Sequence, residues 1–172
     1  MRMQDNLIAR LKYLQIVHHG EVELSHGGTS HYYIDLKKAY GDAEAFYLLA
    51  KRIGEKIPNK VSCIDGGGYG GLPLAAAVSA LYLRDLSLVR DEPKNHGIIK
   101  MIEGHFPTKE DKIAIVDDVF TTGKSLQKIV DIIIPTGAEI VGCYVLVKRG
   151  EGQISVPVES LLRVEDLVVL KS

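Results

Sequence analysis

The sequence predicts an α/β fold with a mostly parallel central sheet flanked by helices. Short apolar runs, most of them rich in β-branched residues, recur along the chain at Val61–Ile64, Leu86–Val89, Ile113–Val116 and Ile140–Val147. Segments with apolar residues at helical spacing lie between these runs, and Leu72–Leu83 is one of them. Strands that alternate with helices form parallel sheets with helices on both faces.

The same patterns predict the remaining elements. Apolar spacing predicts helices over Leu7–Val17, Ala43–Ile53 and Leu126–Ile133. Two strands are expected at Glu21–Leu24 and Tyr32–Leu36, joined by a turn at His26-Gly27-Gly28. A chain of 172 residues is long enough to bury a core and is expected to form one domain, residues 1–172.

Composition excludes several classes of protein. A formal net charge of −1 gives no reason to expect a nucleic-acid or membrane surface. No apolar run approaches transmembrane length, and the N-terminus lacks the apolar core of a signal peptide. Cys63 and Cys143 lie in apolar runs and are expected to be buried thiols. These features fit a protein of the reducing cytoplasm.

Four polar residues are predicted to lie just past strand ends: Asp65, Arg90, Asp117 and Arg149. In open α/β sheets the ligand binds at the carboxyl ends of the strands. The sequence therefore predicts that these residues meet at one rim of the sheet and surround a ligand.

The segment KIAIVDDVFTTGKSL, Lys112–Leu126, is the most informative motif. A buried strand ends in Asp117 and Asp118, and a loop of small and hydroxylic residues leads into a helix. Unpaired N–H groups at the helix start make this loop a phosphate cradle. The carboxylates would repel a phosphate, so we expect them to hold sugar hydroxyls or hydrated Mg²⁺.

Two simpler interpretations of this motif were weighed. A P-loop requires glycine five positions before Gly123, where this chain has Asp118, so its spacing fails. An ordinary strand–turn–helix with Thr and Ser caps remains open, although caps do not need the acidic pair.

A glycine run adds an alternative from a different class of protein. Gly66, Gly68 and Gly71 satisfy G-x-G-x-x-G between a predicted strand and helix, and Asp91 follows about 20 residues later, as in dinucleotide-binding sites. The run would equally suit a tight turn with close helix–sheet packing. The dinucleotide interpretation leaves the acidic pair and its loop unused.

The acidic pair and its loop resemble the phosphoribosyl-pyrophosphate (PRPP) motif of type I phosphoribosyltransferases. Four further segments and the tail resemble, in order, parts of the orotate phosphoribosyltransferases. They are LSHGGTSHYYIDLK (Leu24–Lys37, the N-terminal signature), GGYGGLPLA (Gly67–Ala75, the pyrophosphate loop), VRDEPKNHGIIKMIEG (Val89–Gly104, the mobile catalytic loop), and VKRGEG (Val147–Gly152) with the tail SLLRVEDL (the last strands). The resemblance implies a type I phosphoribosyltransferase-like fold with a small N-terminal hood.

This resemblance implies an activity and its partners. The family transfers the 5-phosphoribosyl group from PRPP to orotate, giving orotidine 5′-monophosphate and pyrophosphate in UMP biosynthesis. It implies Mg²⁺ as the cofactor, held mainly through substrate and water without direct protein ligands. It also implies a cytoplasmic homodimer with shared active sites, which binds neither nucleic acid nor membrane.

The resemblance assigns roles to residues that match the family's motifs. Lys94, His96 and Asp118 are expected to be catalytic, and Thr121, Arg149 and Tyr33 to bind orotate. The residues expected to bind PRPP are Tyr69, Gly70, Gly71, Arg90, Lys94, His96, Asp117, Asp118, Val119, Phe120, Thr121, Thr122, Gly123, Lys124 and Ser125.

Some positions depart from the family pattern. Where the family commonly shows Arg-Lys-Glu, this chain has Arg90-Asp91-Glu92, so an expected cation is replaced by an anion. Ser25 and Gly70 lie where some members carry lysines. Two alternatives therefore remain: a phosphoribosyltransferase for another base, and a PRPP-sensing regulator without catalysis.

Overall fold

The computed structural model describes residues 3–23, 29–92 and 101–168. It divides the chain into two compact units: residues 1–49 with 164–172, and residues 50–163. Helix α3 (Ala43–Lys56) spans the boundary between the two in sequence. None of the helices in these described ranges is long and apolar enough to cross a bilayer.

The first unit is built on a two-stranded antiparallel sheet. Strands β1 (Val17–Glu23) and β2 (Thr29–Ile34) pair from Val17↔Ile34 to Glu23↔Thr29. Helices α1 (Met3–Tyr13), α2 (Lys37–Tyr40) and α6 (Val164–Leu167) and the start of α3 complete the unit. This unit corresponds to the small N-terminal part that the family resemblance implies.

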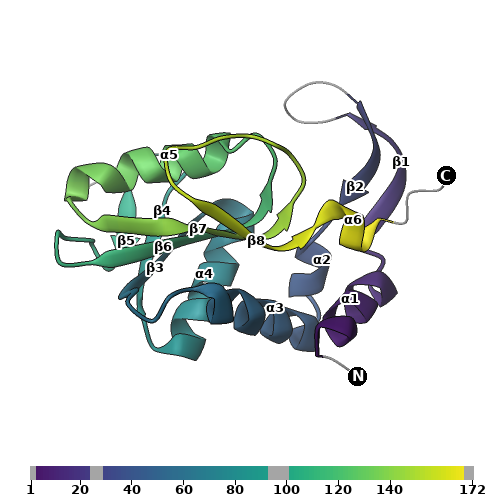
Figure 1. The fold of residues 1–172 in the computed structure, drawn as a ribbon, viewed down its shortest axis with the longest axis horizontal. Helices are drawn as coiled ribbons and strands as arrows, with labels where there is room; N and C mark the ends of the chain where they lie inside the picture. The colour runs from purple at the N-terminus through teal and green to yellow at the C-terminus, as the bar shows by residue number, and fades with distance from the viewer. Residues whose placement is uncertain (1–2, 24–28, 93–100, 169–172) are drawn as a thin grey trace. The chain divides into compact units, whose positions relative to one another are not determined.

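The second unit contains a six-stranded sheet in the order β5-β4-β3-β6-β7-β8 (Figure 1). Its strands are β3 (Cys63–Gly67), β4 (Asp85–Val89), β5 (Ile102–Gly104), β6 (Lys112–Phe120), β7 (Glu139–Lys148) and β8 (Val158–Arg163). All neighbouring pairs are parallel except β4–β5. The predicted fold class, a mostly parallel sheet flanked by helices, is therefore confirmed.

Two helices of this unit pack on opposite faces of the sheet. Helix α5 (Lys124–Ile133) buries Leu126, Ile129, Val130 and Ile133 in a cluster with Cys63, Ile113, Ile115 and Cys143. Helix α4 (Gly68–Tyr82) covers the other face, where a Cβ on Gly66 would lie 2.8 Å from the Ala75 methyl group. Both cysteines are buried free thiols, as the sequence predicted.

Several element boundaries differ from the sequence prediction. Helix α1 ends at Tyr13, and Val17 begins β1 instead of continuing the helix. Helix α4 begins at Gly68, four residues before the predicted start at Leu72, because the glycines form its first turn. The segment after β4 also contains the short antiparallel strand β5, which the polar pattern did not indicate. The predicted turn at residues 26–28 lies outside the described residues.

Candidate active site

A crevice opens between the two central strands of the sheet. Strands β3 and β6 pair only as far as Gly66↔Val116, and β3 then turns into α4. Strand β6 continues along β7 as far as Phe120↔Lys148. The chain leaves β3 toward β4 on one side and β6 toward β7 on the other. This is the topological switch point at which α/β sheets bind ligands.

A cavity of about 260 Å³ lies at this switch point. Its lining comes from the ends of three strands, from the first turn of α4 and from α5: Gly67, Gly68, Gly70, Val89, Arg90, Asp91, Asp117, Asp118, Val119, Ser125, Lys128 and Ile129. A neighbouring hollow of about 440 Å³ shares Gly68, Arg90 and Asp91 and adds Tyr69, Leu72 and Glu92. The carboxyl ends of β3, β4 and β6 therefore border a concave space, and of the four predicted rim residues Arg90 and Asp117 line it.

The acidic pair is held in a fixed orientation by the backbone. Asp117 Oδ1 accepts a hydrogen bond from the Asp118 N–H at 2.9 Å, and Asp118 Oδ1 accepts one from the Val119 N–H at 2.7 Å. Asp117 is 7% exposed, whereas Asp118 is half-buried. A Cβ on Gly70 would lie 2.4 Å from the Asp118 carboxyl carbon, so this carboxylate sits directly against the first turn of α4. The pair is thus preorganised beside two helix starts.

The loop after β6 contacts the segment after β7 backbone to backbone. The N–H of Arg149 donates to the Phe120 carbonyl at 2.8 Å, and that of Gly152 donates to the Thr121 carbonyl at 3.2 Å. A Cβ on Gly150 would lie 2.3 Å from the Thr121 carbonyl oxygen, so only glycine permits this approach. The structure therefore brings the backbone segments that carry Arg149 and Thr121 close together.

The predicted site residues of the second unit gather around the switch point. Tyr69, Gly70 and Gly71 form the first turn of α4, and Arg90 follows β4 directly. Asp117, Asp118, Val119 and Phe120 end β6; Thr121, Thr122 and Gly123 form the loop; Lys124 and Ser125 begin α5. Of these, Gly70, Arg90, Asp117, Asp118, Val119 and Ser125 line the cavity, and Tyr69 lines the neighbouring hollow.

The assignments of three predicted residues stay predictions. Tyr33 lies on β2 in the first unit, opposite His18 in the antiparallel register. Lys94 and His96 lie outside the described residues, so their assignment remains a prediction. Asp91 lines both hollows, so the anion that departs from the family pattern faces the ligand space.

Sequence analysis missed two parts of the lining. Gly67 and Gly68 were noted only in the glycine run and not as site residues, although they end β3 and open α4 at the cavity. Lys128 was not considered, because a lysine in the second turn of a helix resembles any solvated side chain. The available signal was its spacing: Lys128 follows Ser125 by three residues, which places both on the same helix face.

The prediction that Asp65 lies at the rim is wrong. Strand β3 continues through Gly66 and Gly67, so Asp65 is in mid-strand and fully buried. Burial raises the pKa of its carboxyl to about 7, an effect that the Ser87 hydroxyl partly offsets. Among the described residues, neither the carboxyl oxygens nor this hydroxyl makes a hydrogen bond of standard geometry. Asp65 is therefore a buried acid beneath the site and not a ligand of it.

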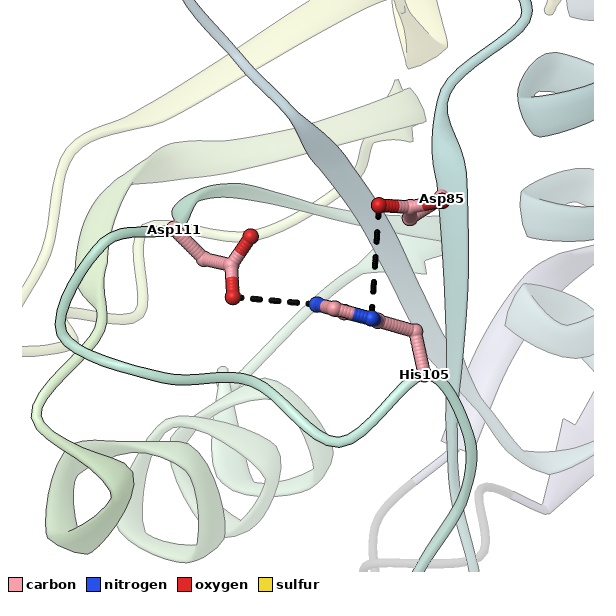
Figure 2. A group of neighbouring side chains, drawn as sticks. All are labelled: Asp85, His105 and Asp111. Atoms are coloured by element: carbon pink, nitrogen blue, oxygen red, sulfur yellow. Dashed lines mark hydrogen bonds and ion pairs between the residues drawn. The ribbon is translucent and has the colours of Figure 1, made fainter.

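A second polar cluster lies at the amino ends of the strands, at the opposite edge of the sheet (Figure 2). His105 Nε2 is 3.0 Å from Asp111 Oδ2, and Nδ1 is 4.0 Å from Asp85 Oδ2. The Asp111 carboxylate also accepts hydrogen bonds from the Thr108 N–H and hydroxyl and from the Ser62 hydroxyl. Burial alone would raise the pKa of Asp111, but these hydrogen bonds, with that from His105 first among them, lower it to about 2.

This cluster is better described as an anchor than as a metal site. The two carboxylates face opposite nitrogens of the imidazole ring. A metal ion bound to one of these nitrogens would therefore have only one of the two carboxylates beside it. The Asp111 oxygens are already used by donors from its own loop and from Ser62. The cluster therefore fixes the loop of residues 105–111 to the base of β3 and β4, away from the cavity.

Comparison with known proteins identifies the family. The model of the phosphoribosyl transferase domain matches residues 38–162. Orotate phosphoribosyltransferase of Methanocaldococcus jannaschii is 38% identical over 88% of this chain and 86% of its own length. That of Methanothermobacter thermautotrophicus is 36% identical over 88% of this chain and 83% of its own length.

Solved structures agree with these relatives. The crystal structure of orotate phosphoribosyltransferase from Aeropyrum pernix superposes with a TM-score of 0.82 at 30% identity, over 94% of this chain and 95% of the other. That from Mycobacterium tuberculosis superposes with a TM-score of 0.79 at 28% identity, over 96% of this chain and 99% of the other. These matches decide against the dinucleotide-binding alternative. The chain that carries the switch-point cavity, the acidic pair and the loop after β6 thus belongs to the orotate phosphoribosyltransferase family.

Proposed function

We infer that this chain transfers the 5-phosphoribosyl group from PRPP to orotate, giving orotidine 5′-monophosphate and pyrophosphate. The observation that carries this inference is the acidic pair at the switch-point cavity, between the glycine turn of α4 and the start of α5. Two helix starts can hold two phosphate groups, and the carboxylates between them can hold a ribose diol. The reaction belongs to pyrimidine biosynthesis, and we place it in the cytoplasm.

The chemistry requires no protein nucleophile. The bond from C1′ to the pyrophosphate oxygen breaks with its electron pair leaving on pyrophosphate. The bond from C1′ to the orotate ring nitrogen forms, and the nitrogen's proton passes to water. Burial raises the pKa of the Cys63 and Cys143 thiols to about 12, so neither is a thiolate at neutral pH. Catalysis therefore consists of positioning the reactants and stabilising leaving-group charge.

Each segment of the site has a role in this scheme. We propose that Asp117 and Asp118 hold the ribose hydroxyls and that residues 121–125 hold the 5′-phosphate. The glycine turn at residues 69–71, with Arg90, binds the pyrophosphate, and Lys94 and His96 stabilise it as it leaves. Arg149 offers a bidentate partner for the orotate carboxylate, with Thr121 near it in the chain fold, and Tyr33 is the third residue that the family resemblance assigns to orotate.

Mg²⁺ fits the donors at the cavity. Carboxylate oxygens and water are the ligands it prefers, and the adjacent Asp117 and Asp118 would hold its hydration shell. When bound, the ion would neutralise part of the negative charge on the pyrophosphate. Preorganisation of the two carboxylates by the Asp118 and Val119 N–H groups supports this assignment.

The base specificity can be tested with a panel of pyrimidine and purine bases, PRPP and Mg²⁺, by following pyrophosphate release. We expect activity with orotate, and we expect Arg149→Ala to raise the KM for orotate at least tenfold while changing the KM for PRPP much less. The reason is that a guanidinium pairs with the orotate carboxylate and not with PRPP.

Arg149→Lys is the matched variant for this test. It keeps the charge but not the planar fork, so it should fall between wild type and Arg149→Ala. Turnover only with purines would indicate a phosphoribosyltransferase for another base. PRPP binding without turnover of any base would indicate the regulator. An equal rise in both KM values would remove the orotate-binding role of Arg149.

We also propose a homodimer in which the segment bearing Lys94 serves the neighbouring chain's site. Mixing inactive Lys94→Ala chains with inactive Asp118→Asn chains should then restore activity. Random pairing makes about half of the dimers hybrids, each with one of two sites intact, so roughly a quarter of wild-type activity should return. No recovery after verified subunit exchange would show that Lys94 acts within its own chain.

A further inference from the structure

The cavity at the switch point contains a lysine that the sequence motifs do not assign. Lys128 lies in the second turn of α5 and lines the cavity together with Ser125 and Ile129 of the same helix. Ser125 belongs to the start of α5, where the 5′-phosphate loop ends. The helix therefore presents a cation to the same space into which the phosphate loop opens.

The amine of Lys128 contacts a residue from another element that also lines this cavity. Its Nζ donates a hydrogen bond to the backbone carbonyl of Asp91, which follows the end of β4. Lys128 thus connects α5 with the segment that carries Arg90 and Asp91. The Asp91 side chain lies near the glycine turn of α4, because a Cβ on Gly68 would lie 3.9 Å from Asp91 Oδ1.

The charges of the described lining residues are unfavourable for a polyanionic ligand. Three carboxylates line it among the described residues, those of Asp91, Asp117 and Asp118, against the two cations Arg90 and Lys128. Arg90 is already engaged: NH1 lies 3.5 Å from Glu103 Oε1, and Nε donates to the Glu92 carbonyl at 3.3 Å. The contact of Lys128 is with a neutral carbonyl, which a phosphate oxygen readily replaces as the stronger acceptor.

We propose that Lys128 binds the pyrophosphate group of PRPP and offsets the negative charge of Asp91. Residue 91 is the position at which the cation common in the family is replaced by an anion. The Lys128 amine donates a hydrogen bond to the carbonyl of this same residue. On ligand binding the amine exchanges the Asp91 carbonyl for a pyrophosphate oxygen. This assignment rests on the proposed function and adds a residue to it.

The test compares Lys128→Gln and Lys128→Arg with wild type. Glutamine removes the charge but keeps a hydrogen-bond donor. We expect Lys128→Gln to raise the KM and Kd for PRPP about tenfold, with a difference that shrinks as salt is added, and to leave the KM for orotate nearly unchanged. Lys128→Arg should retain most of the affinity. Lys109→Gln, an exposed lysine in the loop of residues 105–111, is the matched control and should bind PRPP as wild type does.

Binding of two fragments identifies the end of PRPP that Lys128 contacts. Calorimetry with inorganic pyrophosphate should show the same loss in Lys128→Gln, whereas binding of ribose 5-phosphate should be unaffected. An unchanged Kd for PRPP and for pyrophosphate would overturn the proposal. Lys128 would then only hold the backbone of residue 91 in place. A loss for ribose 5-phosphate alone would also overturn it, by placing the amine on the 5′-phosphate. Wild-type turnover of orotate is measured in parallel, so failure of the proposed function is seen separately.

Discussion

Asp118→Asn should lower turnover at least tenfold, which corresponds to a rise in the activation barrier of about 1.4 kcal/mol. The amide keeps the size of the side chain and can still accept the hydrogen bond that the Val119 N–H donates to Asp118 Oδ1. It loses the charge that we assign to the ribose hydroxyls and to hydrated Mg²⁺. Steady-state kinetics with PRPP and orotate measure the effect, and an unchanged unfolding temperature would show that the fold is intact. Near-normal turnover would remove this role.

Gly70→Ala tests the position of the Asp118 carboxylate without removing its charge. A Cβ at this position would lie 2.4 Å from the Asp118 carboxyl carbon, so the carboxylate has to move away from the first turn of α4. Turnover should fall although no charge is lost. If Gly70→Ala is fully active while Asp118→Asn is not, the position of the carboxylate against α4 is unimportant and only its charge matters.

The sequence predicted the sheet and its ligand edge because both are written in local patterns. The apolar run Ile113–Val116 is buried on both faces of the sheet and so lacks polar alternation. The loop of small residues that follows starts a helix, and α5 begins at Lys124. Such features depend on neighbours within a few residues along the chain, which a single sequence shows directly.

The strand ends were harder to predict because they depend on partners far along the chain. Asp117 and Asp118 were expected after the strand, yet β6 runs on to Phe120 because β7 continues beside it. Asp65 was expected at the rim, yet β3 continues through two glycines before it turns. A residue's distance from its strand's end is set by where the neighbouring strand stops pairing, and composition does not encode this.

Lys128 illustrates the limit for the site itself. Its spacing from Ser125 places it on the cavity side of α5, but exposed lysines recur on most helices and the spacing alone is weak evidence. Its meaning comes from the contact with the Asp91 carbonyl, 37 residues away along the chain. Only the fold brings α5 and the end of β4 together at one cavity.

Asp65→Asn should make the protein more stable above neutral pH. The pKa of Asp65 is about 7 in the folded chain against 3.8 for the unperturbed group, because burial disfavours the charged form. Below about pH 3 the carboxyl is protonated in both states and costs nothing through ionisation. Between these values the unfolded chain ionises first, so stability falls as pH rises, and above pH 7 the loss levels off at about 4 kcal/mol.

The asparagine variant does not ionise and therefore escapes this loss. Denaturant titration at pH 5 and at pH 8 gives the free energy of unfolding of both proteins. The difference between the variant and wild type should be about 3 kcal/mol larger at pH 8 than at pH 5, in favour of the variant. At pH 5 the wild type has lost only about 1.6 kcal/mol in this way, because pH 5 is little more than one unit above the unperturbed pKa, so the difference between the two should be much smaller than at pH 8. Glu110→Gln removes an exposed carboxylate from the same unit and is the matched control. A difference between Asp65→Asn and wild type that does not change between pH 5 and pH 8 would mean that Asp65 is not a neutral acid in the folded protein.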